Sequence, residues 1–339
     1  MRVLVTGASG FFGRGLCRAL LEGGAERVVL FSRSESRQAA IAEQLHHFDA
    51  ARFFLGDVRD RGRLEEAMWG CDTVVHAAAL KQAVLVASDP GEVRKTNVVG
   101  SANVIAAALS ARAKRVLMIS SDKSVAASTF YGVSKAQMEH EAVASNAITA
   151  PRCLAISCTR WGNVLRSTGS VTELWRAQLQ AGRPLTITDP SMTRFVITRR
   201  QAVDFCLASL AVMEGGEVFA PRLPAARLVD IAEATAVWAG PKLGLGGLAQ
   251  TVTIGFRPGG EKHDEALVAP EEAARTWWAG DTMTVLPSYH PWRGVFLGPS
   301  GEKLLTHAYT SGQPDRWVGV DELVGMLAEP VDVVEAGGA

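Results

Sequence analysis

Short apolar runs alternate with longer amphipathic stretches through the first half of the chain. The apolar runs, rich in β-branched residues, predict strands at residues 2–6, 27–31, 52–55, 73–76, 115–120 and 153–159. Helical spacing predicts helices at residues 13–22, 37–46, 63–68, 90–111 and 136–144. Because the strand runs are continuous and separated by helices, they predict an α/β fold, a doubly wound parallel sheet with helices on both faces.

The regular alternation weakens after about residue 165, where Gly- and Pro-containing segments become frequent. We therefore expect residues 1–165, together with part of 195–225, to form a dinucleotide-binding domain. Residues 166–330 are expected to form mainly a smaller C-terminal lobe that binds substrate. Residues 331–339 are small and weakly apolar, which predicts a flexible tail.

Composition and charge exclude several protein classes. The 339 residues are 47% hydrophobic and 21% charged, which is typical of a globular protein. With 35 Lys+Arg against 35 Asp+Glu there is no basic excess, so no nucleic-acid partner is expected. No run approaches the roughly 20 apolar residues of a membrane span, and the N-terminal run is too short for a signal peptide. The five cysteines form no CxxC pair, which predicts reduced thiols and a cytoplasmic protein.

A glycine-rich turn follows the first predicted strand. Gly7, Gly10 and Gly13 stand in the segment TGASGFFG, with Ser9, Phe11 and Phe12 between them. Such glycines allow a tight turn, the close approach of a pyrophosphate and close helix–strand packing, and the helix that follows offers free N–H groups. The turn therefore predicts a Rossmann-type dinucleotide site.

The end of the second strand indicates which dinucleotide binds there. A site for NAD normally has an acidic residue at this place, whereas this chain has Ser32 and Arg33. Arginine suits a phosphate, so we expect NADP as the cofactor. After the third strand come Asp57 and Val58, and the Asp57 carboxylate either accepts a hydrogen bond from the adenine or caps its own loop.

A candidate catalytic cluster follows the fifth strand. Ser121 stands at the strand end, and Tyr131 and Lys135 are at positions i and i+4 of a helix, so they share one face. A lysine ammonium and an oxidised nicotinamide would lower the phenol pKa from its reference of about 10, so that Tyr131 acts as a base. An ordinary surface pair of Tyr131 and Lys135 is the alternative.

Several stretches together resemble the extended short-chain dehydrogenase/reductases, and more narrowly the inverting UDP-N-acetylglucosamine 4,6-dehydratases of the polysaccharide-biosynthesis group. The resemblance covers residues 1–265. The stretches are TGASGFFG, HAAA at 76–79, YGVSK at 131–135, FSRSE at 31–35, ALKQ at 79–82, KTNVVGSANV at 95–104, SSDKS at 120–124, RWGNVLRSTGSV at 160–171, TDPSMTRFVIT at 188–198 and RPGGEK at 257–262.

The resemblance implies a sugar-nucleotide lyase with bound NADP. Tyr131 would take the proton of the sugar 4-OH, Lys123 would remove the C5 proton, and Asp122 would protonate the departing 6-OH. Consecutive residues of an extended strand point to opposite sides, so Asp122 and Lys123 reach one sugar only if the chain turns there. A structural Asp122–Lys123 pair at the strand end is the alternative.

The same resemblance assigns the remaining site residues and the assembly. The cofactor would contact Ala77, Ala78, Ala79, Lys81 and Asn97, and also Tyr131 and Lys135. The UDP-sugar would contact Lys81, Asn163, Arg194, Arg257 and Glu261. Homo-oligomers are implied as well.

Three departures from the family pattern leave other outcomes open. The linker 124–130 lacks the usual proline and asparagine, Trp161 replaces a tyrosine, and RPGGEK has an extra glycine. A 5,6-dehydratase that forms a 5,6-ene, a 4-epimerase and a non-catalytic NADP-binding sensor therefore remain alternatives. No metal is expected, because the sequence has no HExxH motif or Cys/His cluster.

Overall fold

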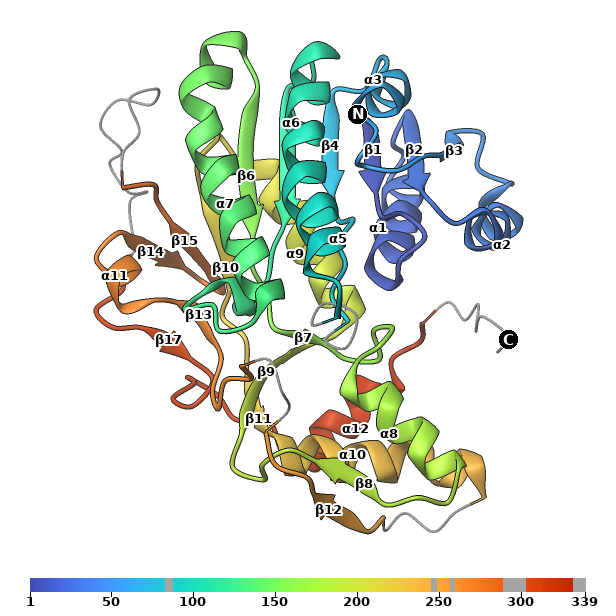
Figure 1. Cartoon of the computed structure of the whole chain (residues 1–339), viewed down its shortest axis with the longest axis vertical. Helices are drawn as coiled ribbons and strands as arrows, with labels where there is room; N and C mark the ends of the chain where they lie inside the picture. The colour runs from blue at the N-terminus through green and yellow to red at the C-terminus, as the bar shows by residue number, and fades with distance from the viewer. Residues whose placement is uncertain (83–87, 245–248, 257–259, 289–302, 332–339) are drawn as a thin grey trace.

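A large mixed sheet forms the main layer of this computed structural model, which describes residues 1–82, 88–244, 249–256, 260–288 and 303–331 (Figure 1). Its strand order within these residues is β16-β14-β15-β10-β6-β5-β4-β1-β2-β3. From β3 to β10 neighbouring strands run parallel. These strands are β1 (Arg2–Thr6), β2 (Arg27–Ser32), β3 (Ala51–Leu55), β4 (Thr73–His76), β5 (Arg115–Ile119), β6 (Ala155–Thr159) and β10 (Val218–Pro221). The predicted Rossmann-type α/β fold is confirmed, and the order reverses between β1 and β4, where such folds bind ligands.

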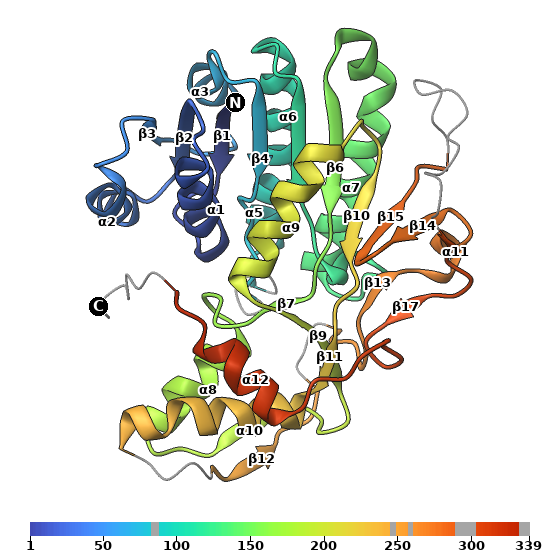
Figure 2. The same ribbon diagram turned by 180° about the vertical axis from the view of Figure 1, so that it is seen from behind.

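Helices cover both faces of the sheet (Figures 1 and 2). Helices α3 and α6 pack together with α7 on one face, and α1 packs against α9 on the other. The helices of this part are α1 (Phe11–Glu22), α2 (Glu35–Leu45), α3 (Arg61–Met68), α5 (Pro90–Arg94), α6 (Gly100–Ser110), α7 (Phe130–Thr149) and α9 (Arg199–Val212).

Two helices differ from their predicted form. The stretch predicted as one helix over 90–111 contains a π-helical turn, η1 (Lys95–Val99), between α5 and α6. Helix α7 begins at Phe130, six residues earlier than predicted, because the Thr129 side chain caps it by accepting from the Gly132 N–H at 3.0 Å. Tyr131 therefore lies in the first turn of α7.

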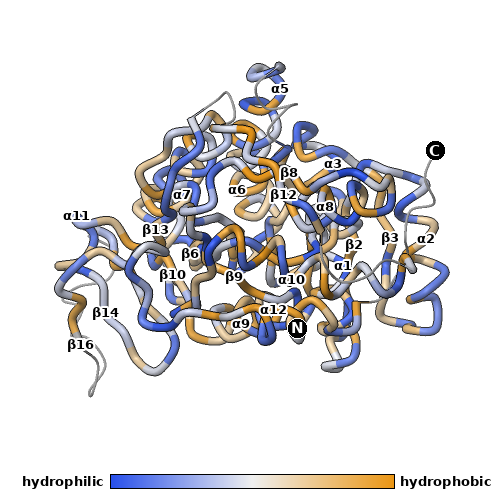
Figure 3. Tube along the Cα trace, turned by 90° about the horizontal axis from the view of Figure 1, so that it is seen from below, coloured by the Kyte–Doolittle hydropathy of each residue, from blue (hydrophilic) through white to orange (hydrophobic). Residues whose placement is uncertain are grey.

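A smaller lobe lies at the carboxyl ends of the parallel strands, and its own hydrophobic core is formed by residues between 165 and 327. Figure 3 shows it from below, with hydrophobic and hydrophilic segments alternating along the chain. Helix α10 packs against α8 and α12. The elements are β7 (Asn163–Val164), α8 (Val171–Gln180), β8 (Leu185–Ile187), β9 (Thr193–Ile197), β11 (Ala225–Arg227), α10 (Leu228–Ala239), β12 (Thr251–Thr253) and α12 (Val320–Ala328), with a short 3-10 turn at η4 (Pro241–Leu243). A further 3-10 turn, η3 (Ala150–Arg152), joins α7 to β6 in the main layer.

The C-terminal half does not all belong to this lobe. Strands within 166–330 pair antiparallel with β10 and with one another and extend the main sheet. Strands β13 (Ala266–Val268) and β17 (Tyr309–Thr310) pair antiparallel with each other, and the short helix α11 (Pro270–Ala273) follows β13. The strands that extend the main sheet are β14 (Thr276–Ala279), β15 (Thr282–Val285) and β16 (Lys303–Leu304). Long-range pairing with β10 decides this placement, and local sequence patterns do not report it.

The described residues contain no helix with the length and apolar character that a bilayer crossing requires. The five cysteines are unpaired, as predicted, and four of them are buried.

His76 is buried between Thr6 and Ser101, whose hydroxyls bond its two ring nitrogens at 2.7 and 2.9 Å. Burial and the charge of Lys135 lower the pKa of His76 to about 3, so it is a neutral core residue.

Candidate active site

The glycines of the turn between β1 and α1 allow the main chain to pack closely there. Gly7 has a φ of +68°, and a Cβ there would lie 2.8 Å from the Ala78 nitrogen. A Cβ on Gly13 would collide with the Gly7 carbonyl oxygen. Helix α1 starts after Gly10 with no side-chain cap and no acidic residue in its first turn. Free N–H groups and a positive dipole end therefore face this turn, which fits a pyrophosphate.

Aromatic contacts hold the start of α1. The Phe11 ring lies 5.2 Å from the Arg199 guanidinium, and the Phe12 ring lies 5.0 Å from the ring of Trp161. Ser9 is partly exposed in the turn itself. These contacts join the turn to α9 and to the segment after β6.

The end of β2 provides an unused hydroxyl and a cation. The Ser32 Oγ is buried and has no hydrogen-bond partner among the described residues. The Arg33 side chain is 49% exposed, and its guanidinium lies 3.6 Å from the Asp57 carboxylate. Asp57 accepts from the backbone N–H and the guanidinium of Arg59, so it caps its own loop; burial raises its pKa, but Arg59 and Arg33 hold it below its usual range. Val58 is buried against Gly100.

Asn97 ties the loop after β4 to helix α7. Its amide pairs with both the N–H and the carbonyl of Leu80, at 2.8 and 2.9 Å, and donates to Ser134 at 3.0 Å. The N–H groups of Ala77 and Ala78 donate to the Thr6 hydroxyl, and Ala79 follows them in the partly exposed loop. Because π-helical turns are frequent at functional sites, the position of Asn97 in η1 supports a role in the site.

Lys81 extends from this loop toward the small lobe. Its ammonium lies 3.2 Å from the Ser167 hydroxyl. Although the residue as a whole is exposed, desolvation of the ammonium and the charge of Lys123 lower the pKa of Lys81 to about 8.

A tight turn after β5 brings Asp122 and Lys123 together. The turn is the 3-10 helix η2 (Asp122–Ser124), and it satisfies the condition that the chain must turn there. The Lys123 ammonium donates to Asp122 Oδ1 at 3.0 Å and to Asn163 Oδ1 at 2.9 Å. Ser121 donates to the same Asp122 oxygen at 2.8 Å. Asn163, from β7, is thus part of the same cluster.

The two ionisable groups of this turn differ in exposure. Asp122 is fully buried, and its second oxygen, Oδ2, has no partner among the described residues. Burial raises the pKa of Asp122, although Lys123 opposes the shift. The Lys123 side chain is 32% exposed, and although burial opposes it, the Asp122 and Glu265 carboxylates raise the pKa of Lys123. A buried acid therefore lies beside an accessible ammonium.

Tyr131 and Lys135 share one face of α7, but the lysine points elsewhere. The Lys135 ammonium donates to the Ile119 carbonyl at 2.7 Å, and burial lowers its pKa to about 8. Burial raises the pKa of Tyr131 to about 12, whereas the charge of Lys123 and hydrogen bonding with Ser121 act to lower it. In this structure the cation that acts to lower the pKa of Tyr131 is therefore Lys123, whereas the helical spacing predicted Lys135.

On the lobe side, Arg194 and Glu261 lie together. Arg194 is 4% exposed, and its guanidinium pairs with the Glu261 carboxylate at 3.1 Å. It also donates to the carbonyls of Lys262 and His263, at 3.2 and 2.8 Å. Arg257, the other arginine expected to contact the UDP-sugar, lies outside the described residues.

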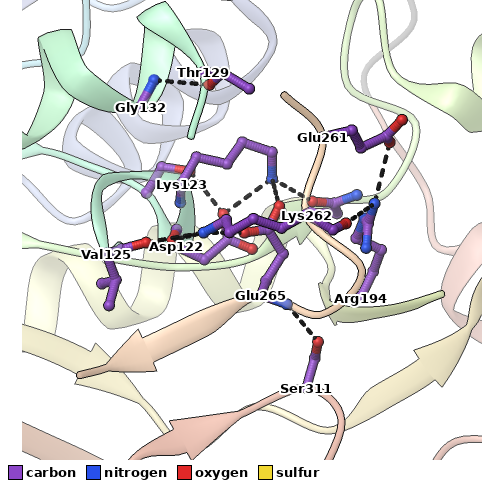
Figure 4. A network of polar contacts seen from close by, with 12 residues as sticks. Asp122, Lys123, Val125, Thr129, Gly132, Arg194, Glu261, Lys262, Glu265 and Ser311 are labelled. Carbon is purple, nitrogen blue, oxygen red and sulfur yellow. Dashed lines mark hydrogen bonds and ion pairs between the residues drawn. The ribbon is translucent and has the colours of Figure 1, made fainter. Parts of the chain in front are cut away.

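Two charged residues at this site were not predicted from the sequence (Figure 4). Lys262 donates to the carbonyls of Val125 and Asp122, at 2.9 and 3.3 Å. Glu265 is buried, with its carboxylate 2.6 Å from the Lys262 ammonium and 3.5 Å from that of Lys123. No short motif indicates these contacts, because 140 residues separate Lys262 from Asp122.

The chain is similar to several known proteins. A model of the family described as polysaccharide biosynthesis protein matches residues 3–287. The inverting UDP-N-acetylglucosamine 4,6-dehydratase of Campylobacter jejuni is 32% identical over 334 residues, covering 96% of each chain. A UDP-glucose 4-epimerase of Rickettsia typhi is 36% identical over 277 residues, covering 80% of this chain and 79% of its own. Among solved structures, Pen from Bacillus thuringiensis superposes with a TM-score of 0.87 at 27% identity and 96% coverage of both chains.

Proposed function

The chain belongs to the polysaccharide biosynthesis protein family, and on that premise we propose that it is an NADP-dependent UDP-N-acetylglucosamine 4,6-dehydratase. The observation that carries the proposal is the buried Asp122 carboxyl beside the accessible Lys123 ammonium, close to Tyr131. Oxidation at C4 needs one acid–base group, the tyrosine. Elimination of water needs two more, a base at C5 and an acid at O6, and Lys123 and Asp122 would supply them.

NADP fits the residues of the β1–α1 turn and of the end of β2. The turn with Gly7 and Gly13 and the N-terminus of α1 would hold the pyrophosphate, and Ser32 and Arg33 would hold the 2′-phosphate. Bound NADP would accept the hydride from C4 and later return it to C6. Its oxidised nicotinamide would also place a positive charge near the phenol.

The protein groups then move protons. Tyr131, as phenolate, accepts the proton of the 4-OH, and Ser121 holds that oxygen. The 4-ketone acidifies the C5–H, whose proton passes to the neutral amine of Lys123. The C6–O bond breaks as Asp122 gives its proton to the departing oxygen, so one water leaves. A proton then returns to C5 when the hydride reaches C6, which completes the 4-keto-6-deoxy sugar. A substrate diphosphate would pair with Arg194 only by replacing Glu261 on its guanidinium.

A second candidate is a 4-epimerase, which the similarity to the Rickettsia typhi protein favours. Proton NMR of UDP-N-acetylglucosamine in deuterated water separates the candidates. We expect the C5 hydrogen signal to disappear and a methyl signal to form at C6. A vinyl signal would indicate a 5,6-ene, and inversion at C4 with all carbon-bound hydrogens kept would indicate an epimerase. An unchanged sugar would favour the NADP-binding sensor over a dehydratase or epimerase of UDP-N-acetylglucosamine.

Replacing Asp122 with Asn should separate oxidation from elimination. The amide keeps the shape but cannot donate the proton that the leaving oxygen needs, so loss of water should slow by about 10²–10⁴-fold. Exchange of the C5 hydrogen for deuterium should continue, because Tyr131 and Lys123 remain. NMR measures both rates in one sample. Asp49→Asn, at an exposed position, is the control, and water loss at the wild-type rate in Asp122→Asn would exclude Asp122 as the acid.

Replacing Arg33 with Ala tests the choice of cofactor. Hydrogen bonds from a guanidinium to a charged group contribute about 1.5–3 kcal/mol, so NADP affinity should fall by about 10–100-fold. NAD affinity should change little, because NAD lacks the 2′-phosphate. Fluorescence titration with both cofactors measures this, with Arg183→Ala, exposed in the small lobe, as control. Equal losses for the two cofactors would contradict the assignment.

A further inference from the structure

Glu265 is a buried carboxylate in the site that the steps above do not use. It is 3% exposed and lies at the start of β13, far in sequence from η2. Its two oxygens face different lysines: Oε1 lies 3.5 Å from the Lys123 ammonium and Oε2 lies 2.6 Å from that of Lys262 (Figure 4). A charge this well buried needs partners, and these two ammonium groups are its partners.

Hydrogen bonds with Ser311 hold the main chain of Glu265 in place. The Glu265 N–H donates to the Ser311 hydroxyl, and the Ser311 N–H donates to the Glu265 carbonyl, both at 2.8 Å. These bonds continue the pairing of β13 with β17. The main chain that carries the carboxylate is therefore anchored independently of Lys123, and the ion pairs with Lys123 and Lys262 direct the side chain.

Three oxygens from three parts of the chain surround the Lys123 ammonium. They belong to Asp122 in η2, Asn163 in β7 and Glu265 before β13, at 3.0, 2.9 and 3.5 Å. An ammonium has three N–H donors, so this arrangement defines the direction of the nitrogen. The other charged or titratable groups that act on Lys123 or lie next to it are Arg194, Lys81, Tyr131 and Lys262.

The pKa values of the two carboxyl groups beside Lys123 are shifted in opposite directions. Lys123 and Lys262 outweigh the burial of Glu265 and hold its pKa below the usual range, whereas burial raises the pKa of Asp122. Two neighbouring acids whose pKa values are shifted in opposite directions by their environments can take different chemical roles. Of the two carboxyl groups beside Lys123, Glu265 is therefore the one that ionises more readily.

We propose that Glu265 is a positioning residue that aims the Lys123 nitrogen and sets the pH at which this lysine releases its proton. The inference rests on the proposed function, in which Lys123 is the base at C5. Glu265 itself touches no reacting atom, and it acts only through Lys123.

The test measures Lys123 directly in the full-length protein and needs no turnover. Acylation by acetic anhydride from pH 6 to 11, followed by mass spectrometry, gives the labelling curve of each lysine, with exposed Lys114 as internal reference. The displacement of the Lys123 curve along the pH axis between two variants is the shift of its labelling midpoint. In Glu265→Gln the labelling midpoint of Lys123 should fall by about one pH unit or more, because an opposite charge within 4–6 Å has been removed. The matched control, Glu271→Gln at an exposed position of α11, should leave it unchanged.

Turnover gives a second readout. The pH profile of C5 hydrogen exchange with UDP-N-acetylglucosamine should move to lower pH in Glu265→Gln, and Glu265→Asp should restore the wild-type profile at reduced kcat. If Glu265→Gln does not fold, Lys262→Met replaces it. That variant frees Glu265 for Lys123, so the labelling midpoint should rise.

The outcomes separate the two proposals. A Lys123 midpoint that is the same in wild type and Glu265→Gln, or in wild type and Lys262→Met, overturns the role of Glu265. A wild-type protein that leaves UDP-N-acetylglucosamine unchanged overturns the proposed function, while the labelling shift still decides whether Glu265 governs Lys123.

Discussion

Tyr131→Phe is expected to lower the turnover of UDP-N-acetylglucosamine about 10³-fold, because the reaction begins with proton transfer from the 4-OH to this oxygen. Phenylalanine keeps the ring and removes only the phenol oxygen that interacts with Ser121 and Lys123. The fold should therefore be unchanged. The affinity for NADP should stay within about twofold of wild type, since the glycine turn at Gly7 lies on other elements. Steady-state kinetics and cofactor titration measure the two quantities.

Tyr309→Phe is the matched control for this loss. Tyr309 is also buried, and its hydroxyl donates to the Leu223 carbonyl at 2.9 Å, away from η2 and α7. This change should cost about 1 kcal/mol of stability and leave kcat near the wild-type value. If Tyr131→Phe kept more than a tenth of the wild-type kcat, the phenol would not be the base.

Arg160→Ala is expected to reduce the free energy of unfolding by about 3–5 kcal/mol. Arg160 is 5% exposed and donates to both Glu139 of α7 and Glu272 of α11, with closest distances of 2.6 and 2.7 Å, and also to the Leu267 carbonyl. Removing the guanidinium leaves two largely buried carboxylates without their main cation. Because α7 carries Tyr131 and the segment before α11 carries Glu265, turnover should fall as well.

Urea denaturation measures this change. The control is Arg200→Ala, whose exposed i,i+4 pair with Asp204, at 3.8 Å, should contribute no more than about 0.5 kcal/mol. A loss below about 1 kcal/mol in Arg160→Ala would mean that the buried pairs contribute no more than surface ones do.

Local patterns predicted the features that depend on neighbouring residues. The spacing of Gly7, Gly10 and Gly13 predicts a turn between a buried strand and a helix, and the three glycines lie at the junction of β1 and α1. The strand runs lie within a residue or two of their predicted bounds, since continuous apolar stretches are what a doubly covered sheet requires. Helix α7 was predicted too short because Gly132 and Val133 are weak helix formers, and the cap at Thr129 outweighs them.

Other features depend on residues that are far apart in the sequence. Lys135 stands one turn from Tyr131, as the spacing predicts, but its ammonium bonds the carbonyl of Ile119, a strand residue. Arg194 and Glu261 were each assigned to the substrate, whereas the lobe pairs them with each other. Strands β14 and β15 extend the main sheet, although their segment was assigned mainly to the small lobe.

The amino-acid order alone was enough for the α/β alternation, the dinucleotide turn and the helical pair Tyr131–Lys135, because each arises from contacts within a few residues. The surroundings of Lys123 required the folded chain. Glu265 and Lys262 reach η2 only after β13 pairs with β17, and the charge of each group depends on its burial and its neighbours, which no linear spacing contains.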